Sequence, residues 1–238
     1  MRRPYQREVR GAAVCDLVVE DIVGQDIGMA VLKRYLFTLV ACCLCQLSAA
    51  ASSCDAPEPV CAWADRVVGI KTPNMIASGT MIADGFIVTN RHVAEDHPRL
   101  MMRDSWGRIG TATPLAHDFA ADLVILRMEG AEGVLDKAPE VADGNSQELH
   151  VVAYDQGRNA PRVYAAGDFA LYPPADASSR ARIHTNARAL PGNSGGAVVD
   201  KAGQLIGILA SGDGKISEVV PAGHITSVLQ STDPEHDA

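Results

Sequence analysis

From Trp63 onward the chain alternates short apolar, β-branched runs with clusters of Gly, Pro, Asn and Asp. Such runs recur between residues 64 and 128 and again between residues 147 and 221, with no long helical pattern among them. Short strands at this spacing predict an all-β barrel or sandwich. The Gly-, Ala- and acid-rich stretch 129–146 is expected to connect two halves, and Ala222 to Gln230 to form a short closing helix.

A Gly-rich turn around Ser194 predicts a nucleophile. Its sequence is Pro191-Gly192-Asn193-Ser194-Gly195-Gly196. A serine hydroxyl attacks only when a base takes its proton, so it has to lie exposed on a tight turn with backbone N–H groups nearby. Flanking glycines allow such a turn. The motif alone does not choose a fold, because α/β-hydrolases share GxSxG and a plain Gly-rich hairpin would look the same.

Two further motifs offer a base and its partner. His92 follows the predicted strand Ile87 to Asn90, where a neutral imidazole can act as a base near pH 7. Asp122 opens the apolar run Leu123 to Leu126, so its carboxylate is expected at the edge of the core, where a His N–H would satisfy it. The simpler alternatives are a surface His at a turn and an Asp that caps a strand.

The chain order of the three residues narrows the choice of fold. His92 precedes Asp122 by 30 residues, and Asp122 precedes Ser194 by 72 residues. An α/β-hydrolase has its acid and its His after the Ser, but only 44 residues follow Ser194 here. The order His, Asp, Ser together with two β halves therefore favours the chymotrypsin arrangement.

Together the motifs resemble those of trypsin-like serine proteases, most of all the bacterial HtrA/Deg branch. The segments that carry the resemblance are residues 78–93, 122–126, 185–196 and 203–208. The likeness extends over about residues 64–230. It implies two six-stranded antiparallel β-barrels of the chymotrypsin type, with His92, Asp122 and Ser194 at their junction as a catalytic triad. It also implies serine endopeptidase activity through a covalent acyl-enzyme. No PDZ-like domain is recognised, so the caged oligomers of that branch are not implied.

The same resemblance implies how a substrate would be bound. The backbone N–H groups of Gly192 and Ser194 would form the oxyanion hole. The edge formed by Ala210, Ser211 and Gly212 would pair with the substrate backbone. Asn193 stands where digestive members carry an Asp that binds a newly freed N-terminus, so we do not expect activation of that kind.

Arg188 leads to a hypothesis about substrate preference. It lies six residues before Ser194, where trypsin-like enzymes have the floor of the specificity pocket. A guanidinium buried there would need a partner, and a substrate Glu or Asp would supply one. The alternative is that Arg188 turns to solvent and leaves a small apolar pocket near Ala210.

Residues 29–51 have the layout of a secretory signal peptide. Lys33 and Arg34 precede an apolar stretch from Tyr35 to Cys45, and Ala49 to Ala51 offer a cleavage site. A membrane span would need about 20 apolar residues, and this stretch is shorter. The sequence therefore predicts export to the periplasm or the medium.

The signal peptide also divides the chain. We expect Met29 to be the true start, residues 1–28 to be a doubtful extension, and residues 52–238 to form the protease domain. Leu39-Val40-Ala41-Cys42 resembles a bacterial lipobox, so the alternative to plain cleavage is a lipid anchor on Cys42. Apart from a signal peptide or such an anchor, no membrane contact is expected.

Two cysteines, Cys54 and Cys61, remain in the expected mature chain, and a close pair in an exported protein predicts a disulfide. The alternative is two free thiols, since no further Cys or His completes a metal site. We expect no metal and no cofactor.

Charge and composition limit the kinds of partner. The formal net charge is −8, hydrophobic residues make up 47% and charged residues 21% of the chain, as in an ordinary globular protein. Without a basic face a nucleic-acid partner is not expected, so the expected partners are protein or peptide substrates. The competing hypotheses are a binding or scaffold protein with a protease fold and a serine esterase. The sequence does not predict an oligomeric state.

Overall fold

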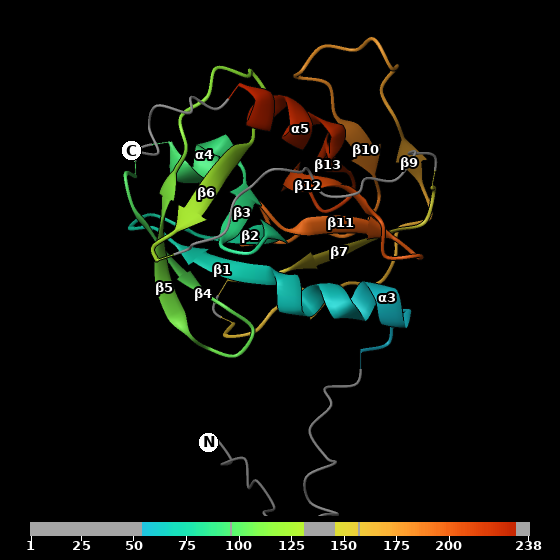
Figure 1. Ribbon diagram of the computed structural model, residues 1–238. Helices are drawn as coiled ribbons and strands as arrows, with labels where there is room; N and C mark the ends of the chain where they lie inside the picture. Colours follow the sequence, from blue (N-terminus) through green and yellow to red (C-terminus); the bar gives the residue numbers. More distant parts are fainter. Residues whose placement is uncertain (1–53, 96, 131–145, 157, 232–238) are drawn as a thin grey trace, which may run out of the picture. The chain divides into compact units, whose positions relative to one another are not determined.

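The computed structural model describes residues 54–95, 97–130, 146–156 and 158–231 (Figure 1). The predicted extension and signal peptide lie outside these residues, as does most of the expected connection 129–146. One compact unit begins at Cys54, two residues after the predicted start of the protease domain, and it contains every described residue.

The first half of this unit is a closed barrel. Its strands follow one another around the barrel in the order β1-β2-β3-β6-β5-β4, and β1 pairs with β4 to close it. Their bounds are β1 Val67–Lys71, β2 Ile76–Ala83, β3 Phe86–Thr89, β4 Leu100–Arg103, β5 Ile109–Pro114 and β6 Val124–Met128. Antiparallel pairing between neighbours allows short turns, and the β2–β3 turn uses Gly85 at a φ of 76°. The predicted six-stranded barrel is confirmed for this half.

The second half is a seven-stranded antiparallel sheet in the order β8-β7-β11-β12-β13-β10-β9. Its strands are β7 Leu149–Ala153, β8 Arg162–Val163, β9 Ala170–Leu171, β10 Ile183–Thr185, β11 Ala197–Asp200, β12 Leu205–Gly212 and β13 Ser217–Pro221. The all-β fold class is confirmed, but this half differs from a closed six-stranded barrel. The two-residue strands β8 and β9 form its edges, and they are too short to give a clear signal in the sequence.

Apolar side chains from both halves form one shared core. Val67 and Val88 of the barrel and Val152 and Ile208 of the second sheet belong to the same buried cluster. The closing helix α5, Gly223–Gln230, adds Ile225 to this cluster and packs against β6 of the barrel and β13 of the second sheet (Figure 1). Burial of this shared surface holds the two halves in contact.

Two helical turns precede β1, where the sequence predicted a strand beginning near residue 64. They are α3, Glu58–Cys61, and the 3-10 helix η2, Ala62–Arg66. A proline in the first turn of α3 is tolerated there because its missing N–H has no helical partner. In the structure Cys54 and Cys61 are joined by a disulfide.

Trp63 explains why this segment turns back onto the domain. Its ring is 7% exposed and belongs to the shared core, and its indole N–H donates to the carbonyl of Gly203 at 2.8 Å. The Arg66 guanidinium lies over the ring, 5.2 Å from its centre. These partners are distant in sequence, so the local pattern alone could not reveal them.

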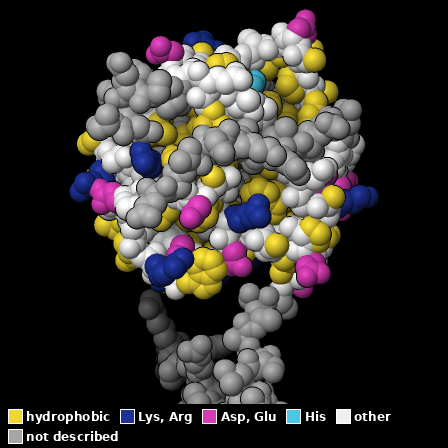
Figure 2. Space-filling view, in the orientation of Figure 1, with side chains coloured by type: hydrophobic (Ala, Val, Ile, Leu, Met, Phe, Trp, Pro, Cys, Tyr) yellow, Lys and Arg dark blue, Asp and Glu magenta, His cyan; other side chains and the backbone are white. Residues whose placement is uncertain are grey.

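On the face drawn in Figure 2, the Lys and Arg side chains of the described residues are interspersed with Asp and Glu side chains and with apolar ones. None of the helices within the described ranges is long and apolar enough to cross a membrane.

We expect Trp63→Ala to lower the free energy of unfolding by about 3–5 kcal/mol, because it leaves a large cavity in the shared core. Trp63→Phe keeps an aromatic ring and removes the hydrogen bond to Gly203, so it should cost only about 1 kcal/mol. Urea unfolding of the three proteins measures both values. An unfolding curve of Trp63→Ala that coincides with that of the wild type would contradict the assignment of Trp63 to the core.

Candidate active site

His92 lies on α4, Arg91–Ala94, a single helical turn directly after β3. Asn90, the residue before the turn, still has an extended backbone, so the chain changes from strand to helix at Arg91. Val93 and Ala94 are buried, so they anchor one side of the turn in the barrel core. The side chain of His92 lies on the other side, with 42% of it exposed.

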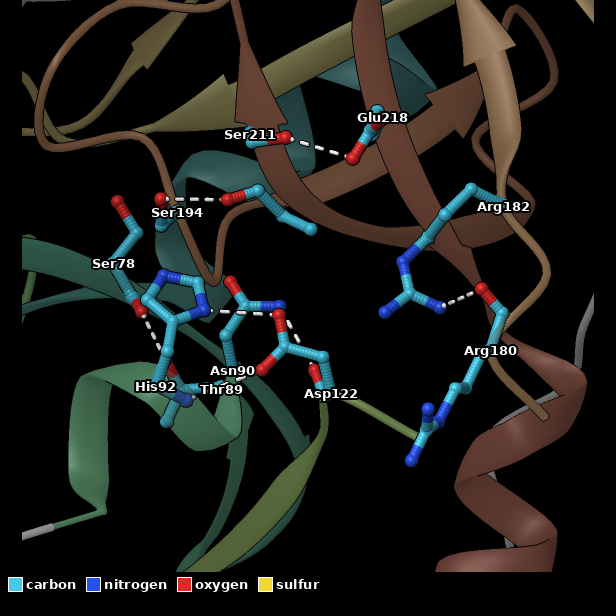
Figure 3. A network of polar contacts seen from close by, with 11 residues as sticks. Ser78, Thr89, Asn90, His92, Asp122, Arg180, Arg182, Ser194, Ser211 and Glu218 are labelled. Atoms are coloured by element: carbon cyan, nitrogen blue, oxygen red, sulfur yellow. Dashed lines mark hydrogen bonds and ion pairs between the residues drawn. The ribbon is translucent and has the colours of Figure 1, made fainter. Parts of the chain in front are cut away.

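Asp122 lies two residues before the start of β6, between the buried residues Ala121 and Leu123. Its carboxylate accepts two hydrogen bonds from His92: the ring Nδ1 is 2.9 Å from Oδ2, and the backbone N–H is 3.2 Å from Oδ1 (Figure 3). The Asn90 side chain donates to the Asp122 carbonyl at 3.0 Å. The contact with Asp122 makes Nδ1 a donor, which leaves Nε2 with the lone pair.

The pairing moves both pKa values. The hydrogen bond to Asp122 raises the pKa of His92 above its ordinary value; burial opposes this, and the charges of Asp122 and Glu95 reinforce it. Burial by itself raises the pKa of Asp122, but the hydrogen bonds and charge of His92, with a smaller effect of Arg182, outweigh it and hold that pKa below its ordinary value. Asp122 is therefore ionised and His92 is a strengthened base at neutral pH.

A second group of contacts, not foreseen from the sequence, ties the same two segments together. The Arg91 guanidinium donates to the Phe119 carbonyl at 2.5 Å and contacts Nδ1 of His117 at 3.3 Å. His117 in turn donates from Nε2 to the Leu123 carbonyl at 2.8 Å. Burial and the Arg91 charge lower the pKa of His117, which keeps it neutral and able to accept from Arg91. The residues beside His92 and beside Asp122 are thus held by one network.

Ser194 comes from the second sheet, on the turn before β11. Gly195 has a φ of 87°, and a Cβ there would lie 1.9 Å from the Ser78 carbonyl oxygen, so only glycine fits. The Ser194 hydroxyl donates to the Ala210 carbonyl at 2.9 Å (Figure 3). No hydrogen bond joins it to His92 in the described structure, so the hydroxyl has to leave the Ala210 carbonyl before it can donate its proton to that base.

The backbone around Gly192 presents two free N–H groups. The Pro191 carbonyl accepts from the Gln156 N–H at 3.0 Å, and the Asn193 carbonyl accepts from the Gly196 N–H at 2.9 Å. In a trans peptide the N–H points away from the carbonyl of the preceding residue, so the N–H groups of Gly192 and Ser194 point away from these partners. Neither has a hydrogen-bond partner within the described part of the chain. They are the two donors that the resemblance assigned to the oxyanion hole.

Asn193, between these donors, is fully buried. Its side-chain oxygen accepts from the Leu190 N–H at 2.7 Å. Its side-chain nitrogen contacts the Tyr154 carbonyl at 2.7 Å, the Tyr164 hydroxyl at 3.0 Å and an Asp155 carboxylate oxygen at 3.2 Å. The amide of Asn193 is therefore held within the chain itself, without an ion pair to a chain terminus.

A cleft of about 410 Å³ adjoins this turn, and Pro191, the residue before Gly192, lines it. The predicted catalytic residues line it, and so do the three predicted backbone-binding residues Ala210, Ser211 and Gly212 of β12. The walls are close together, since a Cβ on Gly212 would lie 2.7 Å from that of Ala189. Among the described residues, Ala189, Leu190 and Leu209 line the part of the cleft beside Ser194. This part of the cleft is therefore apolar.

Arg188 does not belong to this cleft, which corrects the hypothesis of an acid-selecting pocket. Residues 185, 187 and 189 are buried and residues 186 and 188 are exposed, so the alternation turns the Arg188 side chain to solvent. Besides Asp122, the charged residues that line the cleft are Arg182 and Glu218, and Glu218 accepts a hydrogen bond from the Ser211 hydroxyl at 3.0 Å (Figure 3). Neither belongs to a recognisable motif.

The described ranges contain no group of three or more His, Cys, Asp or Glu side chains arranged to hold a metal ion.

Comparison with known proteins gives the family and supports the fold. The trypsin-like peptidase domain family matches residues 77–208. The serine endoprotease DegS of Haemophilus influenzae is 26% identical over 162 residues, which cover 63% of this chain and 45% of the relative. A probable serine protease do-like of Buchnera aphidicola is 31% identical over 144 residues, covering 56% of this chain and 29% of the relative. The chain thus spans less than half the length of these curated relatives.

Solved structures share the fold. A protease from M. tuberculosis in its active form superposes with a TM-score of 0.58 at 21% identity, covering 76% of this chain and 91% of that one. The serine endoprotease from Yersinia pestis gives a TM-score of 0.56 at 22% identity, covering 72% and 64%. These likenesses support the chymotrypsin-like fold expected from the sequence. With the family match extending over more than half of its length, the chain belongs to the trypsin-like peptidase family.

Proposed function

We propose that this chain is a serine endopeptidase that hydrolyses peptide bonds through an acyl-enzyme on Ser194. One observation carries the proposal: the His92–Asp122 pair and the Ser194 hydroxyl border the same cleft, and the turn that carries Ser194 has two backbone N–H groups without a partner among the described residues. Membership of the trypsin-like peptidase family and relatives named as serine endoproteases support it.

The proposed reaction begins with the substrate backbone pairing along Ala210 to Gly212. A substrate N–H that binds the Ala210 carbonyl competes with the Ser194 hydroxyl for that acceptor and favours its rotation toward His92. Nε2 of His92 then takes the hydroxyl proton while Oγ attacks the scissile carbonyl. The Gly192 and Ser194 N–H groups stabilise the developing oxyanion, and Asp122 stabilises the imidazolium.

The second half of the reaction returns the site to its starting state. The protonated His92 donates to the leaving amine, which departs and leaves an ester on Ser194. Water, deprotonated by His92, attacks this ester and releases the acid product. A scaffold protein would bind peptides without these steps, so rapid labelling of Ser194 by a fluorophosphonate, together with cleavage of peptide as well as ester substrates, tests the proposal directly.

We also propose that residues 29–51 are a cleaved signal peptide and that residues 52–238 are the exported protease domain. The compact unit beginning at Cys54 and the disulfide between Cys54 and Cys61 support this division. The N-terminus of protein isolated from its native host tests it. A terminus near Ser52 is expected, whereas a lipidated Cys42 or a retained segment 1–28 would contradict it.

Ser194→Ala or His92→Ala should lower kcat by about 10⁵–10⁶-fold while the protein stays folded, because each removes a member of a group that acts as a unit. For the same reason the double variant should be hardly worse than either single variant. Steady-state cleavage of a fluorogenic peptide measures these effects, and circular dichroism controls for folding. Normal proteolysis by Ser194→Ala would contradict the proposal.

The pH profile should follow the protonation of His92. Only the neutral imidazole accepts the Ser194 proton, so kcat/KM is expected to fall as pH decreases through the pKa of His92, which lies above its ordinary value. In Asp122→Asn the amide cannot supply the negative charge that raises this pKa. The acid limb of the variant should therefore lie at lower pH, with a plateau about 10⁴-fold lower. An acid limb that does not move would argue against Asp122 as the partner of His92.

The apolar part of the cleft beside Ser194 should prefer a small aliphatic side chain before the scissile bond. We expect a peptide with Val at that position to be cleaved faster than matched peptides with Glu or Lys, since Ala189, Leu190 and Leu209 offer no partner for a charge. Because Arg188 is exposed, Arg188→Ala should not change this order. A Glu preference that disappears in Arg188→Ala would instead restore the acid-selecting hypothesis.

A further inference from the structure

Ser78, on β2 of the barrel, has a fully buried hydroxyl that contacts the turn of the second sheet. Its Oγ donates to the Gly192 carbonyl at 2.8 Å and accepts from the Tyr154 N–H at 2.9 Å. Its backbone N–H donates to the Ser194 carbonyl at 2.7 Å. One barrel residue therefore binds the backbone on both sides of Asn193, the residue between the two oxyanion donors.

Gly192 has to be a glycine in this turn. Its φ is 100°, and a Cβ there would lie 2.7 Å from the backbone N of Gln156. The peptide plane that carries the Gly192 N–H is held by the Gln156 N–H, which donates to the carbonyl of that plane. The next plane is held at both ends: the Ser78 hydroxyl donates to the Gly192 carbonyl, and the Asn193 N–H donates to the Leu190 carbonyl at 3.0 Å.

No other described donor contacts the Gly192 carbonyl. Because Ser78 is buried, water does not readily replace its hydroxyl, and the loss of that hydroxyl would leave the Tyr154 N–H and the Gly192 carbonyl unpaired. The cost of two unpaired buried groups favours a rearrangement of the turn.

We infer that Ser78 is a positioning residue for the oxyanion hole: its hydroxyl binds the Gly192 carbonyl and so fixes the position of the turn that carries the Gly192 and Ser194 N–H groups. This inference rests on the proposed function. Ser78 acts through the turn and does not touch the substrate itself.

The test compares Ser78→Ala with Thr185→Val. Thr185 is an equally buried hydroxyl that donates to one backbone carbonyl, of Phe169 at 2.6 Å, and accepts from one backbone N–H, of Ala187 at 3.1 Å. It thus makes the same kinds of bond away from the turn. Both variants are measured in the full chain for kcat, KM, thermal unfolding and affinity for a peptide boronate, whose tetrahedral adduct on Ser194 directs an oxygen at the oxyanion donors.

Ser78→Ala should lower kcat by about 100-fold with little change in KM, the effect of weakening one oxyanion donor. Its affinity for the boronate should fall by a similar factor, because the boronate uses the same donor as the transition state. Thr185→Val should keep kcat and boronate affinity while it loses a comparable amount of thermal stability. Ser78→Ala that behaves like Thr185→Val in all four measurements would overturn the inference.

Two other results are also decisive. If Ser78→Ala does not fold, Ser78→Cys replaces the hydroxyl with a weaker donor of similar shape; a smaller fall in kcat at constant KM supports the inference, and an unchanged kcat overturns it. If the wild type neither cleaves peptides nor binds the boronate, the proposed function fails and the inference fails with it. If the wild type is active and the Ser78 variants keep its kcat and boronate affinity, the inference alone is rejected and the proposed function stands.

Discussion

The close approach of β2 to the nucleophile turn determines how the two halves of this protein meet. A Cβ on Gly195 would lie only 1.9 Å from the Ser78 carbonyl oxygen. The Ser78 N–H donates directly to the Ser194 carbonyl. Thr80, two residues further along β2, donates to the Gly195 carbonyl at 2.9 Å. Backbone contact at this distance leaves no room for a side chain at Gly195. The relative position of the barrel and the second sheet is therefore fixed by hydrogen bonds in addition to apolar burial.

Two histidines of the barrel half, His92 and His117, illustrate how surroundings determine the pKa of the same side chain. His92 contacts a carboxylate, which raises its pKa, whereas His117 is buried and contacts a guanidinium, which lowers its pKa. The pairing with Asp122 leaves His92 with a free Nε2 lone pair, and the second histidine is a neutral connector between Arg91 and the Leu123 carbonyl. The same side chain thus has opposite shifts of its pKa in the two places.

Much of this could be predicted from local patterns. Short apolar runs predicted an all-β fold, and the Gly-rich turn together with the chain order of three polar residues led to His92, Asp122 and Ser194, which the structure brings to one cleft. The rest depends on distant contacts. The turns before β1 follow from Trp63 packing on the second half, and the edge strand at Ala170–Leu171 exists only because Thr185 and His184 pair with it. Arg188 was assigned by position, but position does not show which way a side chain turns. Arg182 and Glu218 line the same cleft although Arg182 lies in the loop before β10 and Glu218 lies on β13.

The barrel contributes His92 and Asp122, and the second sheet contributes Ser194 and both free N–H groups. Neither half therefore holds a complete set of reacting groups. Activity would depend on the relative position of the barrel and the second sheet. A ligand that bound at the interface between the two halves, far from the cleft, could inhibit the protein by separating the halves slightly. It would not need to contact any reacting atom. The interface between the halves is thus a second place, besides the cleft, at which an inhibitor could act.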